Sequence, residues 1–124
     1  MIITRSALLG LFLCGFLAMG ATSRSNEDKE GKAIFTSAKC SNCHSIKTLG
    51  IKGLRPEGGA KPNDLSNTGG KFKAPWIEKW LLKEETLNNK KHMRKFKGTP
   101  EELHTLAAWL ETLKDGSKES KATK

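Results

Sequence analysis

The chain has 124 residues and a formal net charge of +9, with 22 lysine and arginine residues against 13 aspartate and glutamate residues. This length limits it to a single small domain. The positive charge suits an acidic protein partner or an anionic surface, whereas basic stretches poor in arginine and aromatic residues give no support to nucleic-acid binding.

The N-terminal segment, residues 1–20, has the pattern of a secretory signal peptide. Arg5 supplies positive charge, residues 7–18 form an apolar run, and small residues follow where cleavage is expected. The run is shorter than the roughly 20 residues of a membrane-spanning helix. We therefore predict cleavage near residues 20–23 and a mature protein in the periplasm or another extracytoplasmic compartment. Retention of the segment as a membrane anchor is the alternative.

The cysteines point to chemistry and not to a structural disulfide. Cys14 lies inside the signal segment, and the bulky Leu13 before it argues against a lipoprotein signal. The mature chain then keeps only Cys40 and Cys43. A disulfide between such close neighbours would close a tiny loop and contribute little stability, so we interpret the pair as reactive.

The domain is predicted to span residues 26–114, and its first helix to begin at Asn26, a suitable N-cap. Apolar residues then recur at i, i+3, i+4 and i+7 and define one helix face, namely Gly31, Ile34, Phe35 and Ala38. The segment Cys40–His44 is expected to end this helix.

Residues 45–70 are rich in glycine and proline and show no alternating apolar pattern, so we expect an irregular loop and no strand. A loop this long in a compact domain needs something other than secondary structure to order it. A large apolar cofactor would do this.

Two more helices are predicted further along the chain. One starts near Pro75 and carries apolar residues at helical spacing. The other has Thr99 as N-cap, Pro100 in its first turn and Glu102 three residues after the cap, which is the pattern of a capping box. Beyond it, residues 115–124 form a lysine-rich tail that we expect to be disordered.

The sharpest motif is Cys40-Ser41-Asn42-Cys43-His44, which matches Cys-x-x-Cys-His, the attachment motif of c-type haem. Each thiol adds across one vinyl group of the porphyrin, and the following histidine supplies an axial nitrogen to the iron. Two other interpretations stay open. A thioredoxin-like redox pair needs a sheet around it, and a zinc site needs four ligands, to which His92 and His104 would contribute.

From Glu27 to Lys114 the chain resembles a class I, monohaem cytochrome c of the bacterial periplasmic type. The resemblance is carried by Gly31, Phe35, the segment Cys40–His44 and Trp109. It implies an all-α cytochrome c fold, in which three to five short helices wrap around one covalently attached haem c. It also implies that Trp109 crosses the first helix near Gly31.

The same resemblance assigns further cofactor-binding residues. The carbonyl of Pro62 would accept a hydrogen bond from the second ring nitrogen of His44 and so fix the ring. Relatives place this proline directly before Asp-Leu, whereas Asn63 intervenes here. Trp76 and Trp80 would line the haem, although their helical spacing also suits plain core residues.

The sixth iron ligand is predicted to be Met93. Class I cytochromes take a methionine sulfur from the loop before the last helix, and Met93 is the only methionine that remains after the signal segment. Its neighbours Lys91 and Arg94 leave it no apolar face to fill. His92 is the alternative, giving a bis-histidine haem of lower potential, and an open sixth position is the third case.

An iron with six coordination positions filled leaves no site for a substrate, so we expect an electron carrier between extracytoplasmic redox partners and not an enzyme. The alternatives are a haem subunit of an oxidase or dehydrogenase complex, and a ligand-binding haem protein with an open sixth position. An acidic redox partner is expected to dock on the basic residues around Met93, with no nucleic acid and at most peripheral membrane contact. These basic residues are Lys90, Lys91, Arg94, Lys95 and Lys97.

Overall fold

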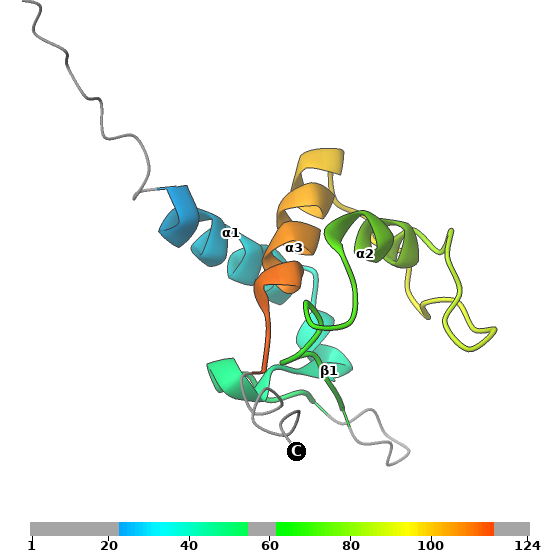
Figure 1. Ribbon diagram of the computed structural model, residues 1–124, viewed down its shortest axis with the longest axis horizontal. Helices are drawn as coiled ribbons and strands as arrows, with labels where there is room; N and C mark the ends of the chain where they lie inside the picture. Colours follow the sequence, from blue (N-terminus) through cyan, green and yellow to red (C-terminus); the bar gives the residue numbers. More distant parts are fainter. Residues whose placement is uncertain (1–22, 55–61, 116–124) are drawn as a thin grey trace, which may run out of the picture.

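The computed structural model describes residues 23–54 and 62–115. In chain order their elements are α1 (Ser23–Ser37), η1 (Cys40–Asn42), β1 (His44–Ser45), η2 (Lys47–Leu49), β2 (Asn63–Asp64), α2 (Ala74–Leu81) and α3 (Pro100–Thr112), where η denotes a short 3-10 helix. Figure 1 shows α1 and α3 meeting near the centre, with α2 beside α3 and the β1 region below them. The all-α fold class is confirmed. The predicted signal peptide, and the predicted lysine-rich tail after residue 115, lie outside the described residues.

The crossing of α1 and α3 depends on the absence of a side chain at Gly31. A Cβ atom added there would collide with the Cβ atom of Trp109. Trp109 is buried, and its ring lies edge-on to Phe35 with the ring centroids 5.7 Å apart. The predicted contact between Trp109 and the first helix near Gly31 is therefore present.

The core is small and is built around α3. Its buried face repeats at helical spacing and meets Phe35 from α1 and Ile46 from the turn after β1. The buried apolar residues of the described chain are Ile34, Phe35, Ile46, Ala74, Ile77, Leu81, Leu103, Leu106, Ala107, Trp109, Leu110 and Leu113.

α2 is attached to α3 through its N-terminus. Pro75 lies in its first turn, as predicted, and the Ala74 backbone N–H donates to Glu111 of α3 at 2.7 Å. Lys73 adds an ion pair with the same carboxylate at 3.3 Å. The hydrogen bond from Ala74, with the charges of Lys73 and Lys114, holds the pKa of Glu111 below its usual range.

The first helix differs from the prediction at both ends. It already includes Ser23, so Asn26 is an interior residue and not the N-cap; no proline or glycine stands between Ser23 and Asn26 to stop the earlier start. It ends at Ser37, before the Cys40–His44 segment. The hydroxyls of Thr36 and Ser37 donate back to the carbonyls of their own helix, and Lys39 then adopts a left-handed conformation with φ 58°.

The prediction that residues 45–70 form no strand is wrong, because the described residues contain one short pair of strands. β1 and β2 are parallel, with His44 opposite Asn63 and Ser45 opposite Asp64. The Asp64 carboxylate accepts hydrogen bonds from the Ser66 hydroxyl at 2.7 Å, the Ser66 N–H at 3.1 Å and the Lys47 N–H at 3.2 Å. These side-chain hydrogen bonds take the place of further backbone pairing between the strands. They connect the loop around Asp64 to Lys47, in the segment that follows the cysteines.

Between α2 and α3 the chain makes a long excursion without helix, drawn at the right of Figure 1. Lys83, Asn88 and Asn89 turn it by adopting positive φ angles, and the Phe96 N–H returns to the Leu81 carbonyl at 2.9 Å. We call residues 82–98 the distal segment. No helix within the described residues is long and apolar enough to cross a membrane.

Candidate functional site

The two cysteines occupy a tight turn that follows α1. After the left-handed Lys39, residues Cys40–Asn42 form η1, and the Cys43 N–H donates to the Cys40 carbonyl at 3.1 Å. Cys40 is half-buried and Cys43 is exposed, and both are free thiols. The motif is thus presented at the surface of the fold in a single turn, with both sulfurs available for reaction.

The distal segment lies close to these cysteines. Burial raises the pKa of the Cys40 thiol, while the positive charge of Arg94 opposes this shift. Arg94 is 54 positions later in the chain than Cys40 but close to it in space. The distal segment therefore lies close to the cysteine turn.

His44 follows the cysteines on β1 and has a buried ring nitrogen without a partner. Its Nδ1 forms no hydrogen bond within the described residues. Burial and the nearby His92 lower the pKa of His44, and the backbone of Asn63 on β2 opposes the shift. A neutral imidazole in such a setting has a lone pair available for a metal.

Pro62 lies next to His44 but not directly opposite it. The strand register puts Asn63 there because this chain carries one residue between the proline and Asp64. The hydrogen bond expected from Nδ1 of His44 to the Pro62 carbonyl is not formed in this structure. Gly53 allows the close approach, because a Cβ atom at this position would collide with Pro62 and come within 2.9 Å of the His44 carbonyl.

His92, on the distal segment, faces His44. The ring centroids lie 6.0 Å apart and the ring planes differ by 12°. The Nδ1 atom of His92 is hydrogen-bonded to the Arg94 carbonyl. Met93, the next residue, has 88% of its surface exposed, and its backbone carbonyl accepts a hydrogen bond from Lys83 at 3.4 Å.

A row of aromatic rings leads to His92. Phe72 and Trp76 stack at 4.2 Å, Trp76 and Trp80 stack at 5.5 Å, and Trp80 meets the His92 ring edge-on at 5.7 Å. Trp76 and Trp80 are only partly buried and pack on the core from outside. Sequence reasoning missed Phe72, although its spacing of four residues from Trp76 and again to Trp80 is a readable signal.

A scan against protein-family models matches the cytochrome c model over residues 29–114. The chain belongs to the cytochrome c family. Searches of curated proteins and of solved structures each gave no significant match. Membership of the cytochrome c family implies haem-based electron transfer, typically by a carrier, with covalently bound haem c.

The residues of this cytochrome c domain fit a haem. Cys40 and Cys43 are unpaired thiols, and His44 follows them with a buried Nδ1 atom that makes no hydrogen bond within the described residues. Trp76 and Trp80 supply partly exposed aromatic faces on the same side as His92. Donors of these types, in this spacing, are the ones that c-type haem uses.

The described residues do not support the other two interpretations of the cysteines, a zinc site and a thioredoxin-like redox pair. These residues contain no group of three or more histidine, cysteine, aspartate or glutamate side chains that could hold a metal ion such as zinc. The pairing of β1 with β2 covers only two residues of each strand, far less than the sheet that surrounds a thioredoxin-like pair.

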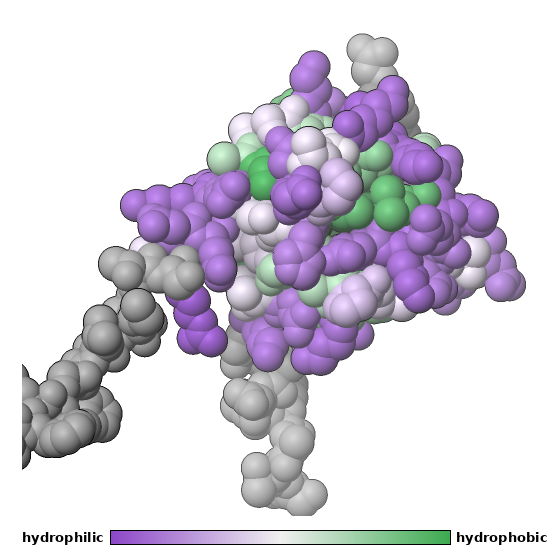
Figure 2. Space-filling model, turned by 90° about the horizontal axis from the view of Figure 1, so that it is seen from above, coloured by the Kyte–Doolittle hydropathy of each residue, from purple (hydrophilic) through white to green (hydrophobic). Residues whose placement is uncertain are grey.

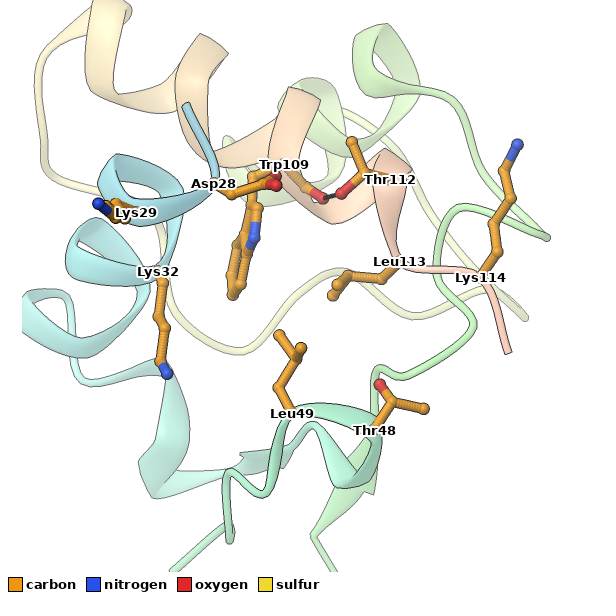
Figure 3. A pocket seen from close by; sticks show the side chains of 9 residues that line it. All are labelled: Asp28, Lys29, Lys32, Thr48, Leu49, Trp109, Thr112, Leu113 and Lys114. Carbon is orange, nitrogen blue, oxygen red and sulfur yellow. Dashed lines mark hydrogen bonds between the residues drawn. The ribbon is translucent and has the colours of Figure 1, made fainter. Parts of the chain in front are cut away.

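A separate pocket of about 430 Å³ lies away from the cysteine turn, between α1, η2 and the end of α3. Figure 3 shows the Trp109 ring, Leu113 and Leu49 pointing into it, with Lys32 of α1 along one side. None of Cys40, Cys43 and His44 lines it. This pocket is therefore not the haem site.

Proposed function

We propose that this protein is a c-type cytochrome that carries single electrons between redox partners outside the cytoplasm. One haem c would be bound through thioethers to Cys40 and Cys43, with His44 as the proximal iron ligand. The observation that carries the proposal is the pair of free thiols in one turn, directly before a half-buried histidine whose Nδ1 atom is buried and makes no hydrogen bond within the described residues.

In this function the cysteine turn, the strand pair and the two tryptophans have separate roles. The turn at η1 presents both sulfurs, and the pairing of β1 with β2 positions the backbone of His44. Trp76 and Trp80 cover one side of the site with apolar surface, which limits water near the redox centre. The bound haem supplies the iron that alternates between ferric and ferrous states.

The proposal includes export, because haem attachment of this type is expected outside the cytoplasm. The support is the signal-peptide pattern in residues 1–20, with Arg5 before an apolar run that is too short to span a membrane. A periplasmic carrier would meet its donor and acceptor by diffusion.

The test of this function is a redox titration of the purified exported protein. We expect one reversible one-electron transition in the visible spectrum and no binding of carbon monoxide by the reduced protein, because the iron has no open position. A reduced protein that binds carbon monoxide rapidly would instead be a ligand-binding haem protein. Absence of any haem after export with the haem-attachment machinery would contradict the proposal entirely.

We further propose that the distal segment is the docking face for an acidic redox partner. Between residues 90 and 97 the chain has five lysine or arginine residues and no acidic residue. Lys90, Lys91, Arg94, Lys95 and Lys97 are all exposed. Figure 2 shows a largely hydrophilic surface that encloses an apolar patch on the side away from the start of α1. A run of exposed positive charge of this kind suits a transient acidic partner.

Small redox reagents can test the docking face without knowledge of the partner. Electron exchange with the anion ferricyanide should slow roughly tenfold or more as salt rises, because salt screens charges beyond about 10 Å at 0.1 M. The variant Lys90→Glu with Lys95→Glu should slow the exchange at low salt and leave the spectrum unchanged. The matched control is Lys29→Glu with Lys32→Glu on α1, which is drawn on the opposite side in Figure 1. An equal effect from both variants would mean that only net charge matters.

A further inference from the structure

The identity of the second axial ligand can be taken from the geometry of the distal segment. Two neighbouring residues, His92 and Met93, carry side chains that bind haem iron. Only one of a pair of adjacent residues can extend towards His44 when the backbone is extended, because successive side chains point to different sides. The question is which of the two does so.

The spacing of the two histidine rings suits one metal between them. A metal–imidazole bond is about 2 Å long, so two imidazoles on opposite sides of one metal have centroids roughly 6 Å apart. The observed centroid distance between His44 and His92 is 6.0 Å, with nearly parallel planes. Among the parallel ring pairs of the described residues this is the widest spacing, since Phe72 and Trp76 stack at 4.2 Å and Trp76 and Trp80 at 5.5 Å.

The hydrogen bond of His92 selects the tautomer that a ligand needs. A backbone carbonyl can only accept, so Nδ1 of His92 must be the protonated nitrogen that donates to the Arg94 carbonyl. Nε2 then keeps its lone pair. Histidines that ligate metals almost always donate their other ring nitrogen to a carbonyl or carboxylate in this way.

The His92 side chain packs against its neighbours, whereas the Met93 side chain is exposed to solvent. The Trp80 ring meets the His92 ring edge-on at 5.7 Å, and His92 is half-buried. Met93 is 88% exposed. For Met93 to reach the iron, the distal segment would have to rotate and lose both the Trp80 contact and the bond to the Arg94 carbonyl.

We propose that Nε2 of His92, and not the sulfur of Met93, is the second axial ligand, so that the haem has bis-histidine coordination. This inference rests on the haem attachment proposed above. An imidazole in place of a thioether lowers the reduction potential. The protein is then a carrier of lower potential than a histidine–methionine cytochrome c.

The test compares His92→Ala with Met93→Leu in the exported holoprotein. Wild type should lack the weak red absorption band of sulfur on ferric haem iron, and Met93→Leu should keep the wild-type spectrum and potential. His92→Ala should open the sixth position, so that the reduced protein binds carbon monoxide. Added imidazole should restore the six-coordinate spectrum, a rescue that a merely structural role of His92 would not give.

The outcomes separate this inference from the proposed function. A red band in wild type that disappears in Met93→Leu would overturn the assignment to His92, even if His92→Ala failed to accumulate. A pyridine haemochrome spectrum of each variant reports haem c whichever residue is the sixth ligand. Its absence would mean that haem attachment itself, and not the ligand assignment, is wrong.

Discussion

Gly31 sets how closely the first and last helices approach. Alanine normally stabilises a helix relative to glycine by about 1 kcal/mol, yet a Cβ atom here would collide with Trp109. We therefore expect Gly31→Ala to lower the free energy of unfolding by about 1–3 kcal/mol, as for other overpacked sites. Denaturant unfolding followed by circular dichroism measures this. Ala33→Ser, on the exposed face of the same helix, should change stability by less than about 0.5 kcal/mol. A stabilising Gly31→Ala would contradict the helix crossing.

Asp64 gives the stability a dependence on acid pH. Burial alone would raise its pKa, but the hydrogen bonds from Ser66 and Lys47 and the charge of Lys47 outweigh this, so the pKa is lowered. A carboxylate with a lowered pKa stabilises the fold above the unfolded-state pKa of about 3.9, and this contribution is lost as pH falls through the folded-state pKa.

We expect Asp64→Asn to lower the free energy of unfolding at pH 7 by roughly 1 kcal/mol, since it removes a charged acceptor of three hydrogen bonds. The difference from wild type should shrink as pH falls below about 4. Urea unfolding of both proteins across this range provides the measurement. A difference that stays constant with pH would show that the carboxylate charge contributes nothing.

The sixth ligand is the part of the candidate site that the sequence leaves open between His92 and Met93. Motif and spacing predict Cys40, Cys43 and His44 as haem-binding residues, because haem attachment constrains residues that lie close together in the chain. The choice between His92 and Met93 depends on how the distal segment rotates when it returns to Leu81 through Phe96. No local pattern encodes that rotation.

Among the elements, α3 was the most predictable. Thr99 accepts from the Glu102 N–H at 3.1 Å, and Glu102 accepts from the Thr99 N–H at 2.8 Å, so the predicted capping box is present. Its signal is local, since cap, proline and first turn lie within four residues. The C-terminal end of α1 was predicted wrongly because it depends on Lys39 adopting a left-handed conformation and on hydroxyls that bond within the helix. Its N-terminal end was predicted too late because no proline or glycine between Ser23 and Asn26 stops the helix.

The capping box gives a test at the level of the helix. Thr99→Ala should lower the free energy of unfolding by about 1 kcal/mol, because it leaves the Glu102 N–H without its acceptor. Glu101→Ala, in the same turn but outside the box, should cost only a few tenths of a kcal/mol. Thermal unfolding of the two variants compares them, and equal effects would indicate that the helix charge and not the cap is responsible.

At the scale of the whole molecule, the core is too thin for the chain to be very stable alone. The largest fully buried side chains in the described residues are Phe35, Ile46 and Leu106, and the row that includes Trp76 and Trp80 stays partly exposed. A bound haem would cover apolar surface of this kind and stabilise the native state by linkage.

The same chain produced without haem attachment should therefore unfold at a lower temperature and less cooperatively than the holoprotein. Far-ultraviolet circular dichroism and differential scanning calorimetry, both in the same buffer, would compare the two. An apoprotein with the same melting temperature as the holoprotein would mean that the helices need no cofactor.

The most direct test of the account is whether haem stays on the polypeptide after acid–organic extraction. The exported protein should keep its colour in the protein phase, and its intact mass should exceed that of the processed chain by one haem. The double variant Cys40→Ala with Cys43→Ala should carry no haem through the same extraction. Haem that leaves with the organic solvent, or a colourless protein with zinc bound to Cys40 and Cys43, would contradict the assignment.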